Sequence, residues 1–165
     1  MADTFFECSK CGTCCRNLLE EREGVLKGLT LTASEKSLFS ENLVSPLTAT
    51  GKRKPEHIID YQLNVGDCPQ VDEHNECRIY DKRPLICRAF PYIQAGFSVK
   101  CLILKKIFKK AGLHIDFPVP YAEGEADQKR DRYFQNRLRK YLKKGSRIWV
   151  FDLATKQWTA VAQRT

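Results

Sequence analysis

The placement of cysteine constrains this chain more than any other feature of its sequence. Four cysteines fall within eight positions near the N-terminus, and four more follow at wide spacing. The eight are Cys8, Cys11, Cys14, Cys15, Cys68, Cys77, Cys87 and Cys101. One or two scattered cysteines are explained as small buried hydrophobic residues, but that explanation does not account for four so close together. We therefore predict that the cysteines bind metal.

The spacing inside the N-terminal group suits two kinds of metal centre. Cys8, Cys11 and Cys14 have the C-x2-C-x2-C spacing that holds three corners of a [4Fe–4S] cluster. The first two, followed by Gly12, are equally typical of a zinc turn. Neighbouring side chains diverge, so Cys14 and Cys15 are expected to serve different centres. Eight thiolates at four per centre predict two centres, of Zn2+ or [4Fe–4S], with zinc slightly favoured.

Composition indicates a folded chain rather than a disordered or membrane-spanning one. The chain has 165 residues, 42% of them apolar, and a mean hydropathy of −0.44. Its fully apolar runs are far shorter than the roughly 20 residues that a bilayer requires. Residues 1–7 lack the charged and apolar regions of a secretory signal. We expect a cytoplasmic protein without membrane contact, whose thiols stay reduced, so that a disulfide framework is disfavoured.

Residue periodicity predicts a small α+β domain. The expected elements are strands at 24–31 and 58–63, amphipathic helices at 102–111 and 127–144, and a C-terminal β-hairpin at 147–151 and 157–161. Thr32 and Glu35 have the spacing of a capping box, which predicts a helix that runs to about residue 39 or 43. Residues 45–57, with two prolines, a glycine and three consecutive basic residues, are expected to form an exposed loop.

These elements are expected to form a single domain organised around the metal centres. Residues 1–101 would be the cysteine-cluster region. Residues 102–165 would supply the basic helices and the hairpin that pack on it.

The later cysteines lie in a longer motif, which resembles that of a known family. Residues 77–91 read Cys-Arg-Ile-Tyr-Asp-Lys-Arg-Pro-Leu-Ile-Cys-Arg-Ala-Phe-Pro. With the N-terminal Cys-x-x-Cys-Gly-x-Cys-Cys and a Cys-Pro pair at Cys68, the chain resembles the YkgJ-type cysteine-cluster family (CxxCxxCC) from residue 8 to about 101. The resemblance implies a domain that chelates zinc or iron. It does not extend to the basic C-terminal third.

The same resemblance brings in one enzymatic activity. The family includes the FliB-like flagellin lysine N-methylases, which implies protein-lysine methylation and a protein substrate. The sequence contains no glycine-rich site for S-adenosylmethionine, nor any other familiar nucleotide-binding motif. Whether the chain is an enzyme stays open at this point.

Three residues of the motif are candidates to support the metal ligands: Tyr80, Arg83 and Arg88. Four thiolates around a divalent ion carry a net charge of −2, which nearby guanidinium groups offset while they donate hydrogen bonds to sulfur. The alternative is that one arginine faces outward and holds a substrate carboxylate or phosphate. Tyr80 is expected to pack beside the site rather than to act in catalysis.

Positive charge is concentrated in one stretch of the chain. Residues 100–147 hold 14 of the 28 Lys and Arg residues but only 5 of the 20 Asp and Glu residues. Such asymmetry favours RNA or another polyanion as a partner, although two solvated helix faces would give the same pattern. The candidate contacts are Lys105, Lys106, Lys109, Lys110, Arg130, Arg137, Lys140 and Lys144. The alternative function is therefore an RNA- or ribosome-associated binding module in which the metal is structural.

Overall fold

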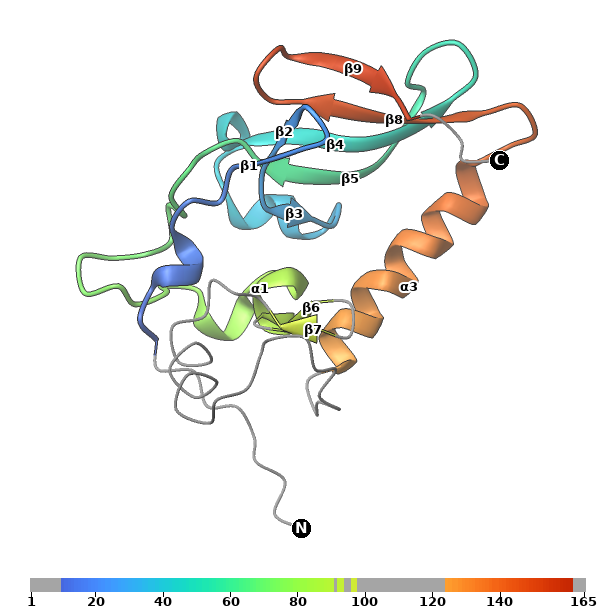
Figure 1. Cartoon of the computed structure of the whole chain (residues 1–165). Helices are drawn as coiled ribbons and strands as arrows, with labels where there is room; N and C mark the ends of the chain where they lie inside the picture. The colour runs from blue at the N-terminus through green and yellow to red at the C-terminus, as the bar shows by residue number, and fades with distance from the viewer. Residues whose placement is uncertain (1–9, 91, 94–95, 98–123, 162–165) are drawn as a thin grey trace, which may run out of the picture. The chain divides into compact units, whose positions relative to one another are not determined.

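The fold contains mainly β-strands with few helices, in the α+β class expected from the sequence (Figure 1). The computed structural model describes residues 10–90, 92–93, 96–97 and 124–161. The chain divides into two compact units that interleave along the sequence: residues 1–16 with 67–129, and residues 17–66 with 130–165. The expected boundary after Cys101 falls outside the described residues and stays a prediction.

The second unit is built on a five-stranded antiparallel sheet. Its strands, in spatial order, are β3 (Thr30–Leu31), β5 (His57–Leu63), β4 (Val44–Gly51), β8 (Arg147–Asp152) and β9 (Gln157–Ala160). A separate hairpin pairs β1 (Glu20–Arg22) with β2 (Val25–Lys27). Strands β5, β8 and β9 correspond to the predicted strands at 58–63, 147–151 and 157–161. The single strand expected at 24–31 is divided between β2 and β3.

The exposed loop expected at 45–57 is wrong for most of its length. Residues 44–51 form β4, the central strand, and its second half is buried. Pro46 fits within the strand because the register shifts between Pro46 and Thr48, as is common where a strand lacks an amide donor. The carbonyl of Pro46 still accepts a hydrogen bond from Gln62 Nε2 at 2.8 Å. Residues 52–56, between β4 and β5, form the loop that the composition indicated, exposed at every position except Pro55.

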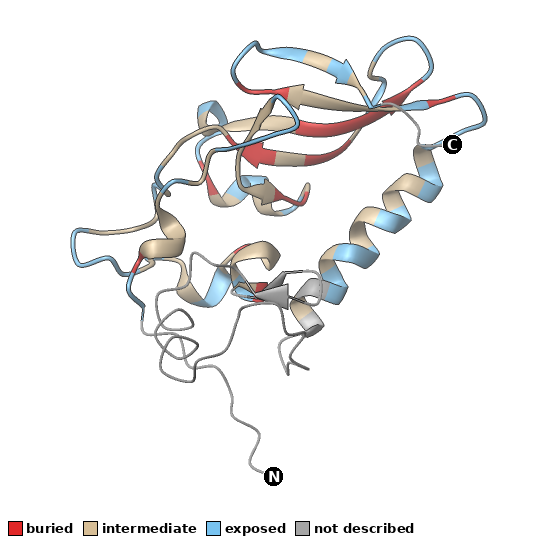
Figure 2. Ribbon diagram, viewed as in Figure 1, coloured by how far each residue is buried: buried red, intermediate tan, exposed pale blue. Residues whose placement is uncertain are grey.

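The core of this unit lies along the central strands (Figure 2). Its fully buried apolar side chains include Leu31, Ala49, Ile59 and Leu63. Gln62 is also fully buried, and all of its amide atoms have partners. Its Nε2 donates to the carbonyls of Pro46 and Phe151, and its Oε1 accepts from the amide of Gly28 at 2.7 Å. This amide therefore links several strands without leaving a buried polar atom unsatisfied.

The short helix after β3 is smaller than expected. Two 3-10 segments, η2 (Glu35–Leu38) and η3 (Glu41–Leu43), stand in place of one helix. Half of the capping box is present, because Glu35 Oε2 accepts a hydrogen bond from the amide of Thr32 at 2.8 Å. The cap therefore stabilises a single 3-10 turn. The segment does not continue as an α-helix, because the chain enters β4 at Val44.

The long helix α3 (Gly124–Tyr141) replaces the one expected at 127–144. It begins three residues earlier, so Asp127 lies inside it and is not its cap. Within the second unit its Tyr133 hydroxyl donates to the carbonyl of Ile59 at 3.0 Å and accepts from the amide of Ala33 at 2.9 Å. The basic helix expected at 102–111 lies outside the described residues.

Apart from the start of α3, the described residues of the first unit form short elements only. They are η1 (Thr13–Cys15), η4 (Tyr80–Lys82), α1 (Leu85–Ala89) and the pair β6 (Tyr92–Ile93) and β7 (Gly96–Phe97). In the part of the chain that the structure describes, no helix combines the length and the apolar character needed to cross a membrane.

Candidate metal centre

The N-terminal cysteine turn is held in a conformation that requires glycine. Gly12 has φ +70, and the amide of Cys15 donates to its carbonyl at 2.9 Å to close the 3-10 turn η1. A Cβ atom at residue 12 would lie 2.6 Å from Cβ of Asn75. The glycine therefore serves two purposes, a left-handed backbone and a close approach to the second cysteine segment.

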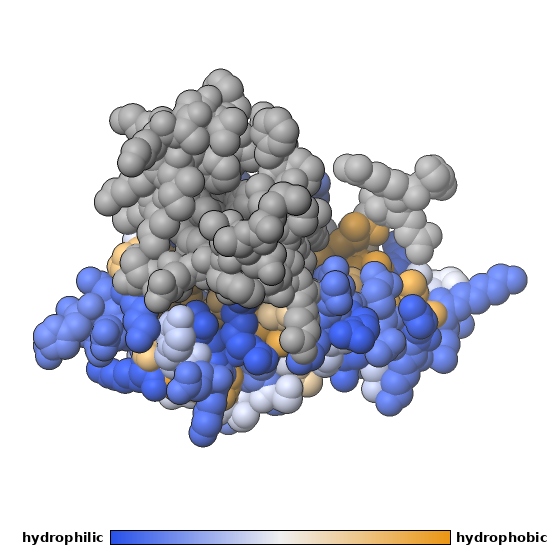
Figure 3. All heavy atoms as spheres, turned by 90° about the horizontal axis from the view of Figure 1, so that it is seen from below, coloured by the Kyte–Doolittle hydropathy of each residue, from blue (hydrophilic) through white to orange (hydrophobic). Residues whose placement is uncertain are grey.

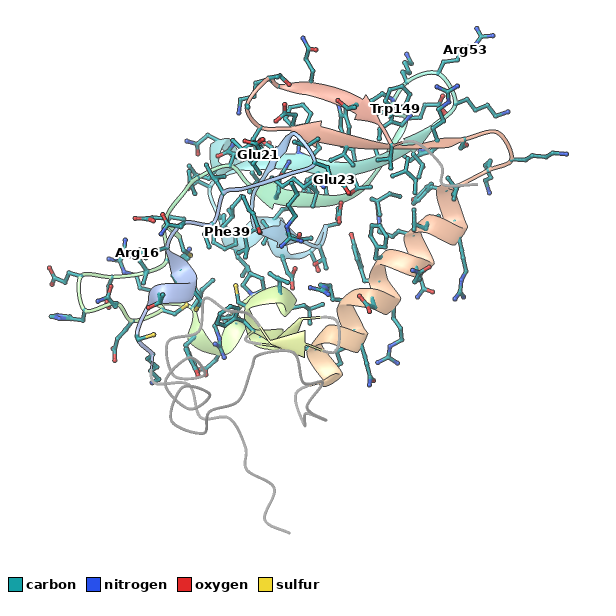
Figure 4. All side chains as sticks on the ribbon, in the orientation of Figure 1. Arg16, Glu21, Glu23, Phe39, Arg53 and Trp149 are labelled. Carbon is teal, nitrogen blue, oxygen red and sulfur yellow. The ribbon has the colours of Figure 1, made fainter. Side chains whose placement is uncertain are left out.

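A second segment is fastened directly to this turn. The amide of Cys68 donates to the carbonyl of Cys15 at 2.8 Å. The side chain of Arg16 pairs with Asp67 at 3.0 Å and donates to Asn75 Oδ1 at 3.3 Å. Sequence reasoning missed Arg16, which Figure 4 labels beside η1. Its only signal was its place directly after the cysteine group.

The third segment carries Cys77 and Cys87. Cys77 forms an isolated antiparallel bridge with Val71. Pro84 is buried and precedes α1, so that the amide of Cys87 donates to the carbonyl of Pro84 at 2.9 Å. Pro84 therefore begins the turn that places Cys87 within the short helix α1.

Electrostatic coupling shows which thiols lie near one another. The hydrogen bond with Cys14 and the burial of the side chain raise the pKa of Cys15 to about 12, although a hydrogen bond with Cys68 acts in the opposite direction. Its hydrogen bond with Cys15, and then burial, raise the pKa of Cys68. Burial raises the pKa of Cys87, and so do the charges of Cys68 and Cys15. The charge of Cys77 acts on both Cys15 and Cys87.

Five cysteines from three segments are thus brought into one neighbourhood, which we name the thiol group. Its members are Cys14, Cys15, Cys68, Cys77 and Cys87. The described residues include six of the eight cysteines, all as thiols rather than disulfides. Cys11 is exposed and donates to Thr13 Oγ1 at 3.3 Å. Cys8 and Cys101 lie outside the described residues.

The thiol group fits a soft metal ion by the chemistry of its donors. Hydrogen bonds between thiols and burial favour the neutral form and raise these pKa values, with repulsion between thiolate charges adding to the effect. A bound cation favours the thiolate form instead. Among the described residues, no three Cys, His, Asp or Glu side chains already have the arrangement of a metal site. The predicted assignment of all eight cysteines as ligands stays a prediction.

The three residues expected to support the ligands occupy different positions. Arg83 is half-buried, donates through Nε to the carbonyl of Tyr80 at 2.8 Å, and stacks with Cζ 3.7 Å from the centre of the Tyr80 ring. Its charge lowers the pKa of Cys87, against the effect of burial. Lys10, which sequence reasoning missed, lies over the same ring at 4.9 Å. Arg88 is exposed.

Among the described residues, the basic side chains proposed to contact nucleic acid differ in exposure. The side chain of Arg130 is only 17% exposed, with Nη2 3.6 Å from Oδ1 of Asp131. Arg137 is directed inward, since its Nη2 donates to the carbonyl of Ile58 and its Nε is buried. Arg137 is thus half-buried, and its role as a nucleic-acid contact stays a prediction. Lys140 and Lys144 are exposed, as expected.

The remaining four candidates of that set lie outside the described residues. They are Lys105, Lys106, Lys109 and Lys110. Their role as contacts stays a prediction.

The comparison with known families decides the family. The model of the CxxCxxCC family, described as "Putative zinc- or iron-chelating domain", matches residues 7–111. The chain belongs to the CxxCxxCC family. The match spans all eight cysteines of this CxxCxxCC domain, together with Tyr80, Arg83 and Arg88. No curated protein and no solved structure matches the chain.

Membership agrees with the resemblance drawn from the motifs. The description of the CxxCxxCC family supports a metal cofactor held by the cysteine cluster and leaves open whether it is zinc or iron. It lends no support to lysine methylation or to RNA binding.

Proposed function

We propose that this CxxCxxCC domain binds metal through its cysteine thiolates at two centres, and that the metal is zinc. The observation that carries the proposal is the thiol group, in which cysteines from three distant segments influence one another's protonation. A zinc ion bound there would cross-link these segments and contribute folding free energy. The short elements of the first unit are consistent with a need for such a link.

We assign the first centre to ligands from the thiol group. Four of its five members are needed, and Cys15, Cys68 and Cys87 are the members whose pKa is raised. The second centre would use the three cysteines outside the thiol group, Cys8, Cys11 and Cys101, with one further ligand. This division follows from the exposed position of Cys11, which bonds to Thr13.

The chain's own groups prepare the first centre in two ways. The Cys68–Cys15 backbone hydrogen bond and the Arg16–Asp67 ion pair hold two segments in register before any metal binds. Arg83 supplies positive charge beside Cys87, which favours the thiolate that a metal requires.

The test is metal stoichiometry after anaerobic purification, measured by elemental analysis and absorbance. We expect two zinc ions per chain and no visible absorption. Cys87→Ser should lose one equivalent and Cys11→Ser the other, since each variant removes a ligand of a different centre. Iron with charge-transfer bands would keep the ligand assignment and replace zinc by an iron–sulfur cluster. Protein with neither metal would contradict the proposal.

A further inference from the structure

Two loops far apart in the sequence lie at the same end of the five-stranded sheet (Figure 1). In the pairing of β4 with β8, Gly51 is opposite Arg147. In the pairing of β4 with β5, Thr50 is opposite His57. The end of β4 therefore lies beside the beginnings of both neighbouring strands. Residues 52–56, which join β4 to β5, and residues 142–146, which join α3 to β8, therefore lie at the same edge of the second unit.

Both loops carry exposed positive charge. The cluster of cations is apparent only when the two loops are considered together. We name this set the basic end. Its exposed members are Lys52, Arg53, Lys54, Lys143, Lys144 and Arg147. Within residues 52–56 and 142–147 only Glu56 is acidic. Half of the set comes from outside the basic stretch 100–147, so the charge asymmetry of the sequence did not identify it.

The backbone under the basic end is well fixed. The amide of Glu56 donates to the carbonyl of Thr50 at 2.9 Å, and the amide of Ser146 donates to the carbonyl of Lys143 at 2.9 Å. The indole Nε1 of Trp149 donates to the carbonyl of Gly51 at 3.1 Å. Figure 4 shows Arg53 directed away from the sheet, with Trp149 near the base of its turn. The loops are thus held in place while their charged side chains reach into solvent.

A pair of stacked rings borders the basic end. His57 is exposed, and its ring stacks on Tyr141 with a centroid separation of 4.8 Å and an interplanar angle of 27°. Thr50 Oγ1 donates to the carbonyl of Tyr141 at 3.4 Å, so the end of α3 is tied to the same edge. Lys140 lies 5.1 Å from the Tyr141 ring. A flat ring surface beside a row of cations is the combination that single-stranded nucleic acids require.

We propose that the basic end binds a single-stranded nucleic acid. Cations from adjacent strand ends, which lie about 4.8 Å apart, would contact successive backbone phosphates. The exposed face of His57 would stack on a base. A membrane surface fits less well, because the described residues expose only two large apolar side chains, Leu142 next to Lys143 and Val161 opposite Ile148. Hydrophilic residues also make up most of the described surface in the view of Figure 3. The proposal is independent of which metal the cysteines bind.

The test is fluorescence anisotropy with labelled single-stranded RNA and DNA, using the full-length, metal-loaded protein. The patch variant combines Arg53→Glu with Lys144→Glu, one change in each loop. The matched control combines Lys36→Glu with Lys156→Glu, which alters the net charge equally; Lys156 lies in the turn at the opposite end of β8. In about 50 mM salt, the patch variant should bind at least about tenfold more weakly, with the control unchanged.

Salt dependence and a neutral variant complete the design. Between about 50 and about 200 mM salt, the slope of log K against log salt should be smaller by about 2 for the patch variant. The neutral double variant, Arg53→Gln with Lys144→Gln, should also bind more weakly than the native protein, by a smaller factor. It replaces the charge-reversal variant in the test if that variant does not fold. A difference in affinity between the RNA and the DNA probe identifies the preferred kind of nucleic acid. Equal losses in patch and control variants, or absence of binding by the native protein at low salt, would overturn the proposal.

Discussion

The backbone amide of Cys68 donates a hydrogen bond to the carbonyl of Cys15, at 2.8 Å. This bond joins two cysteine segments through the main chain, in addition to any metal that their side chains share. The thiols of the same two residues also influence each other's pKa. The arrangement separates what the polypeptide fixes by itself from what a metal must supply, and the first prediction uses that separation.

Removal of metal should loosen the first unit and leave the sheet intact. The cysteine segments 11–16 and 67–78 have few buried apolar side chains, so they depend on ligation for protection. After treatment with a strong chelator, their amide hydrogen exchange should accelerate at least about tenfold, while exchange in β4, β5 and β8 stays the same. Exchange followed by mass spectrometry measures both regions in one sample. Equal acceleration in the sheet would show that the metal supports the whole chain.

Replacement of Gly12 by alanine should destabilise the cysteine turn more than the same change at Gly24. Both glycines have positive φ, but a Cβ at Gly12 would lie 2.6 Å from Asn75, whereas Gly24 has nothing within 4 Å. Gly24→Ala should cost about 1 kcal/mol of unfolding free energy from backbone strain alone. Gly12→Ala adds the clash, so we expect about 2–3 kcal/mol and reduced metal content.

Urea denaturation of metal-loaded protein measures both costs. The difference between the two variants isolates the contact with Asn75 from the effect of φ. If both variants lose the same free energy and retain metal, the close approach has no energetic role.

Stability should fall as the pH rises from about 4 to about 6 because of Asp60. Burial raises the pKa of Asp60 from 3.8 to about 6, although the hydrogen bond from Thr48 and the charge of Arg137 oppose this. The folded protein therefore binds more protons than the unfolded chain in this range, so the free energy of unfolding decreases with rising pH. The expected contribution is about 1–3 kcal/mol. It is fully present below pH 4 and is lost above pH 6.

The control for this prediction is Asp60→Asn, which keeps an oxygen acceptor for the amide of Thr48. Its unfolding free energy should lack the decrease between those pH values. Thermal unfolding of both proteins across the pH range gives the comparison. If the unfolding free energy of the native protein decreases no more than that of the variant between pH 4 and pH 6, Asp60 does not titrate as described.

Arg83 should matter to metal retention and Arg88 should not. Arg83 is half-buried, lies against Tyr80, and lowers the pKa of Cys87, whereas Arg88 is exposed. We expect Arg83→Gln to reduce metal affinity by about 10- to 100-fold and Arg83→Lys to restore part of it. Arg88→Gln is the matched control. Competition with a chromophoric chelator measures each affinity, and a similar loss in both glutamine variants would place Arg88 beside the centre as well.

Sequence patterns predicted the elements whose residues alternate or repeat strongly. Strand β5 and the hairpin of β8 and β9 are rich in β-branched and aromatic residues, which is a local signal. Strand β4 was missed because Pro46 and Gly51 look like turn residues. This strand is stabilised by pairing with β5 and β8, one on each side. A short stretch of sequence gives no sign of such pairing with distant strands.

The candidate site was predictable in its composition and less so in its supports. Cysteine spacing and the 77–91 motif identified the residues of the thiol group directly. Arg16 and Lys10 were missed because their roles arise from Asp67, Asn75 and Tyr80, which are distant in sequence. Arg137 was expected on the surface because charge is usually exposed, but its long side chain reaches the carbonyl of Ile58.

The interleaved order of the two units has a consequence for how the chain folds. Strand β4 pairs with β8 across roughly 100 residues, most of them in the segment 67–129, so closing this loop delays completion of the sheet. Metal that compacts the segment shortens the effective loop to less than half. Each halving of loop length lowers the entropic cost of closure by only about 0.6 kcal/mol, which is roughly a threefold change in rate. The sheet should therefore assemble modestly faster when metal is available during synthesis, but its assembly should not require metal.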